Sequence, residues 1–454
     1  MFSQDGEMFV VSPVPTCTRP ADRRPTSLDS DGDGGRKCRE GRGKPGLGFP
    51  CPPVLVELLS RHRRDVRDGF SDPEELNQIM VFQSDELRWT AQKRGLWSLE
   101  YKRELTSPLC IAAAQGFTEC LQYLLEHGAH PNLSAGGKAA LHEACANGNT
   151  DCVELLLDHG ANPNQLTEDG LTPLHLCTTP QSLRCAKAVV RHGAKVHLPS
   201  EEEEETPLHV AARHGLPHHA QLYLRYGAHI NHTSSSGETP LGLACSEAQD
   251  KLEEDQDEPH LQLCHLLLAY GANVNLSDSE RRTPLHKAAR NVQVKLVQLL
   301  LDHGADINAI DYNGCSPLSC VLQTSNIRQE WQPHIVVQTL LNHGSIKVWP
   351  QALLKVLTAC ASSPKTVEIL FNSYNLVPVT SKWAEAIPED LFQLHRPFYE
   401  SLFALEYKPR CLQHLCRSAL RKHFGKHCHS LIPRLPIPRS LQDYLLLQPE
   451  GFII

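Results

Sequence analysis

Two short sequence markers recur along this chain at a shared period of about 33 residues, and such a period constrains the fold strongly. The first is a tetrapeptide similar to T-P-L-H, and the second is the glycine of an H/Y-G-A/S tripeptide. The second residue of the tetrapeptide stands at positions 108, 140, 173, 207, 240, 284 and 317, and the glycine stands at 128, 160, 193, 227, 271, 304 and 344. Two independent markers with one period over seven copies predict a repeat array.

Each marker has a mechanical role in a pair of helices. In Thr172-Pro173-Leu174-His175, the Thr hydroxyl can cap a helix, and the proline fits a first position whose amide would be unpaired. A second, strongly apolar helix follows, as in Cys152 to His159. Gly160 then ends that helix in the left-handed conformation that suits glycine. Histidines that precede such a glycine can interact with the end of the helix dipole.

This unit of two antiparallel helices and a projecting turn resembles the ankyrin repeat, and the resemblance covers residues 105–346. It implies an all-α solenoid of seven repeats with projecting β-turns, in which the marker histidines bond backbone between turns. The pattern departs from the usual one at Ala140, which replaces proline. The lengthened fifth copy contains an acidic stretch from Glu247 to Glu258, for which we expect a solvent-exposed loop.

The regions on either side of the repeats are expected to cover the ends of the stack. Residues 54–104 are predicted to form an N-terminal helical capping region, with helices at 54–64 and 87–99. Residues 347–407 are predicted to be a C-terminal helical region that begins with a degenerate helix pair at 351–361 and 366–374.

The first 53 residues contain eight prolines and eight glycines, a composition that predicts disorder. Within them, the residues Asp29, Asp31, Asp33, Gly34 and Glu40 match the spacing of a calcium-binding loop. The flanks lack the helices that such a loop needs, so we interpret the match as a solvated acidic linker and predict no metal.

Charge and cysteine content limit the function classes. The chain has a formal net charge of −8, and residues 408–454 hold eight basic and two acidic groups, so the body before them is acidic. An acidic body argues against nucleic-acid binding. Seventeen cysteines without a C-x-x-C pair indicate no disulfide framework. Without a signal peptide or an apolar run long enough to span a membrane, we expect a cytoplasmic location, with the nucleus as the alternative.

The C-terminal 47 residues contain two ordered motifs. The first has Leu412, Leu415, Cys416, Ala419 and Leu420 on one predicted helical face, opposite a strongly basic face. The second is Leu435-Pro436-Ile437-Pro438, followed by Leu441 and Tyr444. Together they resemble the SOCS box at 408–454, with its BC box at 411–420 and its cullin box at 431–446. Cys411 departs from the Ser, Thr or Pro that usually opens the BC box.

Ankyrin repeats followed by a terminal SOCS box identify the chain as a member of the ankyrin repeat and SOCS box (ASB) family. The resemblance implies that Leu412, Leu415, Cys416 and Leu420 bind elongin C, which associates with elongin B. It implies that Leu435, Pro436, Ile437, Pro438, Leu441 and Tyr444 bind cullin 5, which brings its RING partner. The chain would then be a non-catalytic substrate-recognition subunit of a ubiquitin ligase, without a cofactor. The alternative is an ankyrin scaffold that sequesters a partner and is stabilised by elongins.

Target contacts are expected at the turn tips and the helix face that the repeat geometry leaves free. The candidates are Leu166, Glu168, Glu201, Glu203, Glu205, Glu238 and Arg281. The glutamates at 201–205 would attract a basic target, or they form a solvated loop. A zinc site at Cys411, Cys416, His423 and His427 is a further interpretation. The cysteine pair and the histidine pair are too close in sequence for a finger-type zinc site, and zinc binding would remove Cys416 from the apolar face.

Overall fold

A computed structural model describes residues 76–91, 97–248, 259–380, 382–406 and 408–453, all within one unit of the chain, residues 50–454. The predicted disordered segment 1–53, the calcium-loop match and the predicted helix at 54–64 lie outside the described residues. So does the acidic insertion from 249 to 258.

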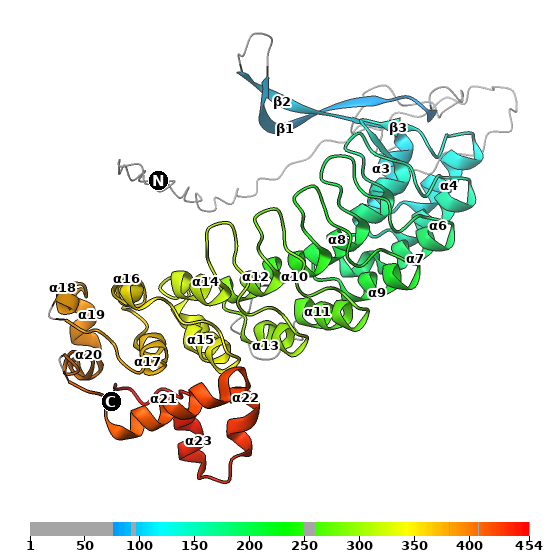
Figure 1. The fold of residues 1–454 in the computed structure, drawn as a ribbon. Coiled ribbons are helices and arrows are strands. Elements are labelled where there is room, and N and C mark those ends of the chain that lie inside the picture. The colour runs from blue at the N-terminus through cyan, green and yellow to red at the C-terminus, as the bar shows by residue number, and fades with distance from the viewer. Residues whose placement is uncertain (1–75, 92–96, 249–258, 381, 407, 454) are drawn as a thin grey trace, which may run out of the picture. The chain divides into compact units, whose positions relative to one another are not determined.

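Consecutive helix pairs make up the described residues from 107 to 342 (Figure 1). The first elements of the pairs are α3 (Pro108–Gln115), α5 (Ala140–Asn147), the 3-10 turn η1 (Pro173–Leu176), α8 (Pro207–Arg213), α10 (Pro240–Glu247), α12 (Pro284–Arg290) and α14 (Pro317–Thr324). The second are α4 (Thr118–Glu126), α6 (Thr150–Asp158), α7 (Leu183–Arg191), α9 (Pro217–Arg225), α11 (Pro259–Ala269), α13 (Val294–Asp302) and α15 (Pro333–Asn342). Neighbouring first helices pack on each other, which confirms the predicted ankyrin fold.

The marker histidines connect one repeat to the next. His209 Nδ1 accepts from the Thr206 amide at 3.2 Å, and its Nε2 donates to the Glu238 carbonyl of the following repeat at 3.1 Å. His175 and His286 make the same pair of contacts, which confirms the structural role predicted for them. The predicted Thr cap differs here, because the hydroxyl of Thr206 bonds the imidazole at 2.9 Å instead of the helix backbone.

The third repeat lacks a full first helix. Only η1 forms after Thr172, and a second 3-10 turn, η2 (Pro180–Ser182), precedes α7. Pro180 cannot donate the backbone hydrogen bond that continued helix needs, and it disfavours helical backbone at Thr179. The position of the repeat was predicted correctly, but the helix at its start was not.

The predicted helix at 87–99 is wrong, because this region forms strands. β1 (Met80–Ala91) pairs with β2 (Trp97–Thr106) as an antiparallel hairpin, from Met80 opposite Thr106 to Ala91 opposite Trp97. Aromatic and β-branched residues are frequent in these segments and favour strands over helix. A second, short hairpin joins β3 (Ser134–Ala135) and β4 (Lys138–Ala139) before the second repeat.

Asn77 connects the region before the hairpin to the first repeat. Its side chain donates to the Gly128 carbonyl at 3.3 Å and accepts from the His130 amide at 2.8 Å. Asn132 makes the same two contacts to the next repeat, with the Gly160 carbonyl and the Asn162 amide. Asn77 therefore occupies the position of a repeat asparagine, and the buried Leu76 extends the core beside it.

The predicted degenerate helix pair is confirmed as α16 (Leu353–Ala359), which follows the turn η4 (Pro350–Ala352), and α17 (Pro364–Asn372). The short helices after it are α18 (Lys382–Glu385), α19 (Glu389–Leu394) and α20 (Arg396–Phe403). The C-terminal module contains α21 (Leu412–Phe424), η5 (Gly425–His427), α22 (Cys428–Leu431), η6 (Ile432–Arg434) and α23 (Arg439–Leu445) (Figure 1). The turn η3 (Gln329–Trp331) precedes α15.

One apolar core runs through the repeats and includes Leu447 and Ile453 near the C-terminus. The C-terminal module has only a small core of its own, formed by Cys428, Ile432 and Leu445. Such a core is small for an independent fold, so the module depends on its contacts with the repeats. Among the described helices, none is long and apolar enough to span a membrane.

Candidate functional site

Helix α21 is amphipathic in the reverse of the usual sense, because its apolar residues face outward. Leu412 is 77% exposed, and Leu415, Cys416 and Leu420 are also exposed. Most surface helices turn such a face toward the core. An apolar face that stays in water marks a protein interaction site. The structure therefore brings the four residues of the predicted BC box together on one open surface.

The basic face of α21 points inward. His414 is fully buried, and its Nε2 donates to the Tyr374 carbonyl at 2.7 Å. Arg410 and Arg417, both buried, each donate to its Nδ1 at 2.8 Å. Burial and then the nearby charge of Arg410 lower the pKa of His414 to about 4, so the imidazole is neutral and can accept from both guanidinium groups. This face anchors α21 on Tyr374, which lies two residues beyond the end of α17.

Arg421 extends the anchor to α15. Its guanidinium donates to Asn342 Oδ1 at 2.6 Å and to the Leu341 carbonyl at 3.2 Å. It also donates to the Leu445 carbonyl at 2.7 Å. Side chains of Gln338 and Asn342 in turn donate to the Leu446 carbonyl, each at 2.9 Å. One arginine thus joins the last repeat to both long helices of the module.

The predicted cullin box has a solvent-exposed segment whose backbone conformation is fixed by hydrogen bonds. Pro436 and Pro438 are exposed, and Leu441 is 43% exposed at the start of α23. Gln442 Nε2 donates to the Leu435 carbonyl at 3.0 Å and to the Ile437 carbonyl at 3.3 Å. The side chains of Leu435 and Ile437 are half-buried against the module's small core.

Tyr444 lies inside the module, which corrects its prediction as a direct partner contact. Its side chain is 5% exposed, and the Arg417 guanidinium lies over its ring, 4.1 Å from the centroid. Burial raises the pKa of its hydroxyl. An aromatic ring under a buried cation stabilises that cation. Tyr444 therefore supports the inward face of α21.

Residues 446–453 form a C-terminal strap that sequence reasoning missed. The buried carboxylate of Glu368 in α17 accepts from the amides of Glu450 at 2.6 Å and Gly451 at 3.0 Å. Ser401 Oγ in α20 accepts from the Ile453 amide at 2.9 Å. The signal in the sequence was a glutamate within an otherwise apolar helical segment, and it did not reveal its partner. The strap fastens the module to the helices that end the solenoid.

The zinc reading does not fit the arrangement of the thiols. Cys411 Sγ accepts from the His414 amide at 3.4 Å as the cap of α21, while Cys416 lies on the outer face of the helix. The described residues hold no group of three or more His, Cys, Asp or Glu side chains that could bind a metal ion.

Five of the seven predicted target contacts are exposed at the repeat tips: Leu166, Glu168, Glu201, Glu203 and Arg281. The other two are corrections. Glu205 is buried, because its carboxylate pairs with Arg213. Glu238 is half-buried and pairs with the buried Lys287.

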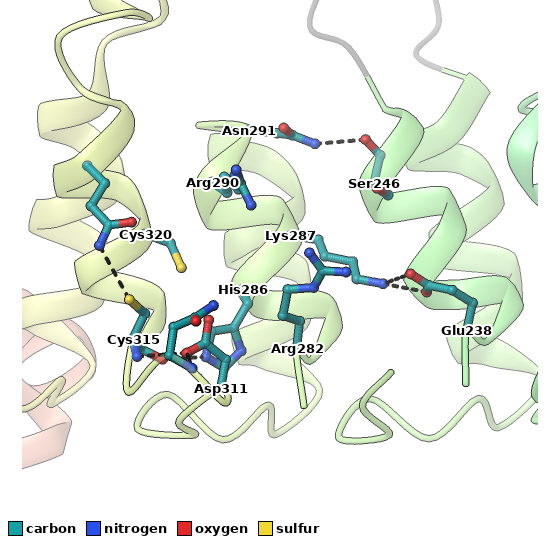
Figure 2. A pocket seen from close by; sticks show the side chains of 12 residues that line it. Glu238, Ser246, Arg282, His286, Lys287, Arg290, Asn291, Asp311, Cys315 and Cys320 are labelled. Atoms are coloured by element: carbon teal, nitrogen blue, oxygen red, sulfur yellow. Dashed lines mark hydrogen bonds and ion pairs between the residues drawn. The ribbon is translucent and has the colours of Figure 1, made fainter. Parts of the chain in front are cut away.

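A hollow of about 480 Å³ lies beside this second pair, between α10, α12 and α14 (Figure 2). In the wall of this hollow, the Lys287 ammonium forms an ion pair with Glu238 and also lies 3.3 Å from the Asp278 carboxylate. Asp278 accepts from Arg282 Nε at 2.9 Å, and these hydrogen bonds and cations lower its pKa against the opposing effect of burial. The hollow is therefore lined by fixed ion pairs.

Two family models match the chain. The model described as ankyrin repeats (3 copies) matches residues 94–167, 109–200, 159–234 and 255–352, and the model described as SOCS box matches residues 408–446. Human ankyrin repeat and SOCS box protein 18 is 50% identical over 90% of this chain and 88% of its own length. Human ankyrin repeat and SOCS box protein 16 is 42% identical over 88% of this chain and 87% of its own length. Human ankyrin repeat and SOCS box protein 10 is 44% identical over 81% of this chain and 79% of its own length. The chain belongs to the ankyrin repeat and SOCS box family.

Proposed function

We propose that the chain is the substrate-recognition subunit of an elongin B/C–cullin 5–RING ubiquitin ligase. The observation that carries the proposal is the outward apolar face of α21, which contacts of the buried His414 and Arg417 and of the half-buried Arg421 hold in place. A helix presented in this way is suited to insert its apolar residues into a groove of a partner.

Elongin C is the partner proposed for that face. Leu412 and Cys416 serve as the central anchors, and Leu415 and Leu420 widen the contact. Their exposure supports this role, because a few well-placed apolar side chains carry most of the energy of such an interface. Elongin B joins the complex through elongin C.

Cullin 5 is the partner proposed for Leu435, Pro436, Ile437, Pro438 and Leu441. The two exposed prolines give this segment a stiff backbone, so little conformational entropy is lost on binding. The Gln442 contacts to the carbonyls of Leu435 and Ile437 support the same preorganised shape. Cullin 5 in turn brings its RING partner.

The chain acts without catalytic groups of its own, as a non-catalytic adaptor that holds a target near a ubiquitin-loaded E2. Catalysis then comes from proximity and orientation. The Arg421 contacts and the C-terminal strap support this role, because they limit movement of the SOCS box against the repeats. The exposed tip residues Leu166, Glu168, Glu201, Glu203 and Arg281 remain candidate target contacts, and we propose a cytoplasmic location.

Reconstitution from purified components tests this function. The chain is co-expressed with elongins B and C, and the complex is offered to cullin 5 bound to its RING partner. Replacing the exposed Pro436, Pro438 and Leu441 by alanine should leave elongin recovery unchanged and reduce cullin 5 capture by about tenfold or more. A wild-type complex that recovers elongins but no cullin 5 would favour the sequestering scaffold instead.

A further inference from the structure

Three neighbouring hollows with shared lining residues lie at the C-terminal end of the repeats. The first is the hollow of about 480 Å³ beside α12, which Gln323 connects to a second of about 220 Å³ between α14 and α16. A third hollow of about 250 Å³ shares Ser319, Val348 and Ala352 with the second. We refer to these three hollows as the C-terminal groove.

One end of the C-terminal groove is apolar and exposed. Ile310, Ile346 and Trp349 line the third hollow and are 55%, 71% and 73% exposed. Asn308 Oδ1 accepts from the Ile346 amide at 2.8 Å, which fixes the edge of this hollow to the preceding tip. Large apolar side chains gathered around a hollow mark a protein contact, and tryptophan is frequent among the residues that dominate such contacts.

The other end has unused positive charge. Both carboxylates in its lining have partners within the protein: Glu238 forms an ion pair with Lys287, and Asp311 accepts hydrogen bonds from the backbone amides of Asn313 and Cys315 at 2.9 and 2.8 Å. Arg290 lines the same hollow and is exposed (Figure 2). Within the described part of the chain it has no ion pair or hydrogen-bonded side-chain partner. Lys355, in the second hollow, is exposed in the same way.

We propose that the C-terminal groove binds a target segment that carries an aspartate or glutamate beside bulky apolar residues. The carboxylate pairs with Arg290 in the first hollow, the exposed Lys355 adds positive charge in the second, and the apolar side chains cover Ile310, Ile346 and Trp349. Charge complementarity argues for this occupant, because a basic segment would bring like charge to Arg290. The inference rests on the proposed function and gives its target a chemistry opposite to that expected from the glutamates at 201–205.

A random peptide library displayed on phage tests the inference, with the purified full chain as bait and elongin C binding measured in a separate assay. We expect wild type to enrich acidic peptides with a nearby aromatic or aliphatic residue. For one selected peptide, labelled with a fluorophore, Arg290→Glu and Trp349→Ala should each weaken binding by about tenfold or more. Tyr226→Ala, an exposed aromatic side chain at the end of α9 and outside the C-terminal groove, is the matched control and should bind as wild type does.

Both substituted side chains are exposed, so the variants should keep the thermal unfolding midpoint of wild type. Enrichment of basic peptides, an absence of enriched peptides, or equal binding by Arg290→Glu would each overturn the inference. Failure of the proposed function can be distinguished from failure of this inference. A chain that binds the acidic peptides but no elongin C retains the groove and loses the ligase role, and a chain that binds only elongin C shows the reverse.

Discussion

The Arg417 guanidinium lies over the ring of Tyr444, 4.1 Å from its centroid, and connects α21 with α23. Both side chains are buried, so the pair belongs to the interior of the SOCS box. The contact helps to keep a charged group inside the module while leucines on the opposite face of the helix remain in water. The outward apolar face of α21 therefore depends on buried residues on the opposite side of the helix.

Substitutions at Tyr444 separate its ring from its hydroxyl. The hydroxyl is buried without a hydrogen-bond partner among the described residues, so Tyr444→Phe should leave stability unchanged or raise it by up to about 1 kcal/mol. Tyr444→Ala removes the ring below Arg417 and should cost about 3–5 kcal/mol. Urea unfolding of the two variants measures the difference. Equal stability of both would contradict the support role of the ring.

Buried histidines predict a loss of stability in mild acid. Burial is the largest cause that lowers the pKa of His209, His219 and His414 to about 4, from an ordinary value of 6.5. Between these two pH values the unfolded chain binds more protons than the folded chain, so stability falls as the pH falls. Each group should contribute roughly 1–2 kcal/mol of loss between pH 6.5 and 5.

The unfolding midpoint in urea, measured at several pH values, checks this dependence. His209→Gln should reduce the slope with pH even though it also lowers the overall stability. An unchanged slope would show that His209 titrates normally in the folded chain.

Lys287 and Arg290 share helix α12 but should differ in their effect on stability. Lys287 is buried between Glu238 and Asp278, whose side chain is 2% exposed. Lys287→Ala leaves these carboxylates without one of their cations and should cost about 3–5 kcal/mol. Arg290→Ala is the matched control and should change stability by less than about 0.5 kcal/mol, because Arg290 is exposed. Thermal unfolding gives both values, and similar values for both variants would contradict the account of the ion pairs.

Glu368 should control the C-terminal strap. Glu368→Ala removes the acceptor for the Glu450 and Gly451 amides and should cost about 1–3 kcal/mol, with faster hydrogen exchange in residues 446–453. Glu450→Ala keeps its own backbone amide and serves as the control. Unaltered exchange in the Glu368 variant would show that the strap is held by other contacts.

The fold was largely predictable because the repeat markers report backbone geometry. Thr206 and His209 make contacts within their own turn or to the next one, and Pro207 opens helix α8, so the local pattern encodes the stacking of the repeats. The third repeat and the hairpin were not predictable in this way. At Pro180 one residue outside the marker prevents the helix, and strands β1 and β2 carry no repeat marker.

The docking site was predictable in part. The apolar spacing of Leu412, Cys416 and Leu420 indicates one helix face, but a helix wheel cannot say which face points inward. That choice depends on long-range partners of the basic face, such as Asn342 for Arg421. The burial of Tyr444 and the strap at Glu368 depend on similar distant contacts, which a single sequence does not encode locally.

Direct binding of elongin C tests the central claim most directly. The purified chain is titrated with elongin B/C in a calorimeter, using wild type, Leu412→Ala and the control Leu394→Ala. Leu394 is also exposed, at 70%, but lies in α19 outside the SOCS box. We predict a loss of affinity of about tenfold or more for Leu412→Ala and none for the control. Equal affinity for all three proteins would contradict the assignment of the outward face of α21 as the elongin C site.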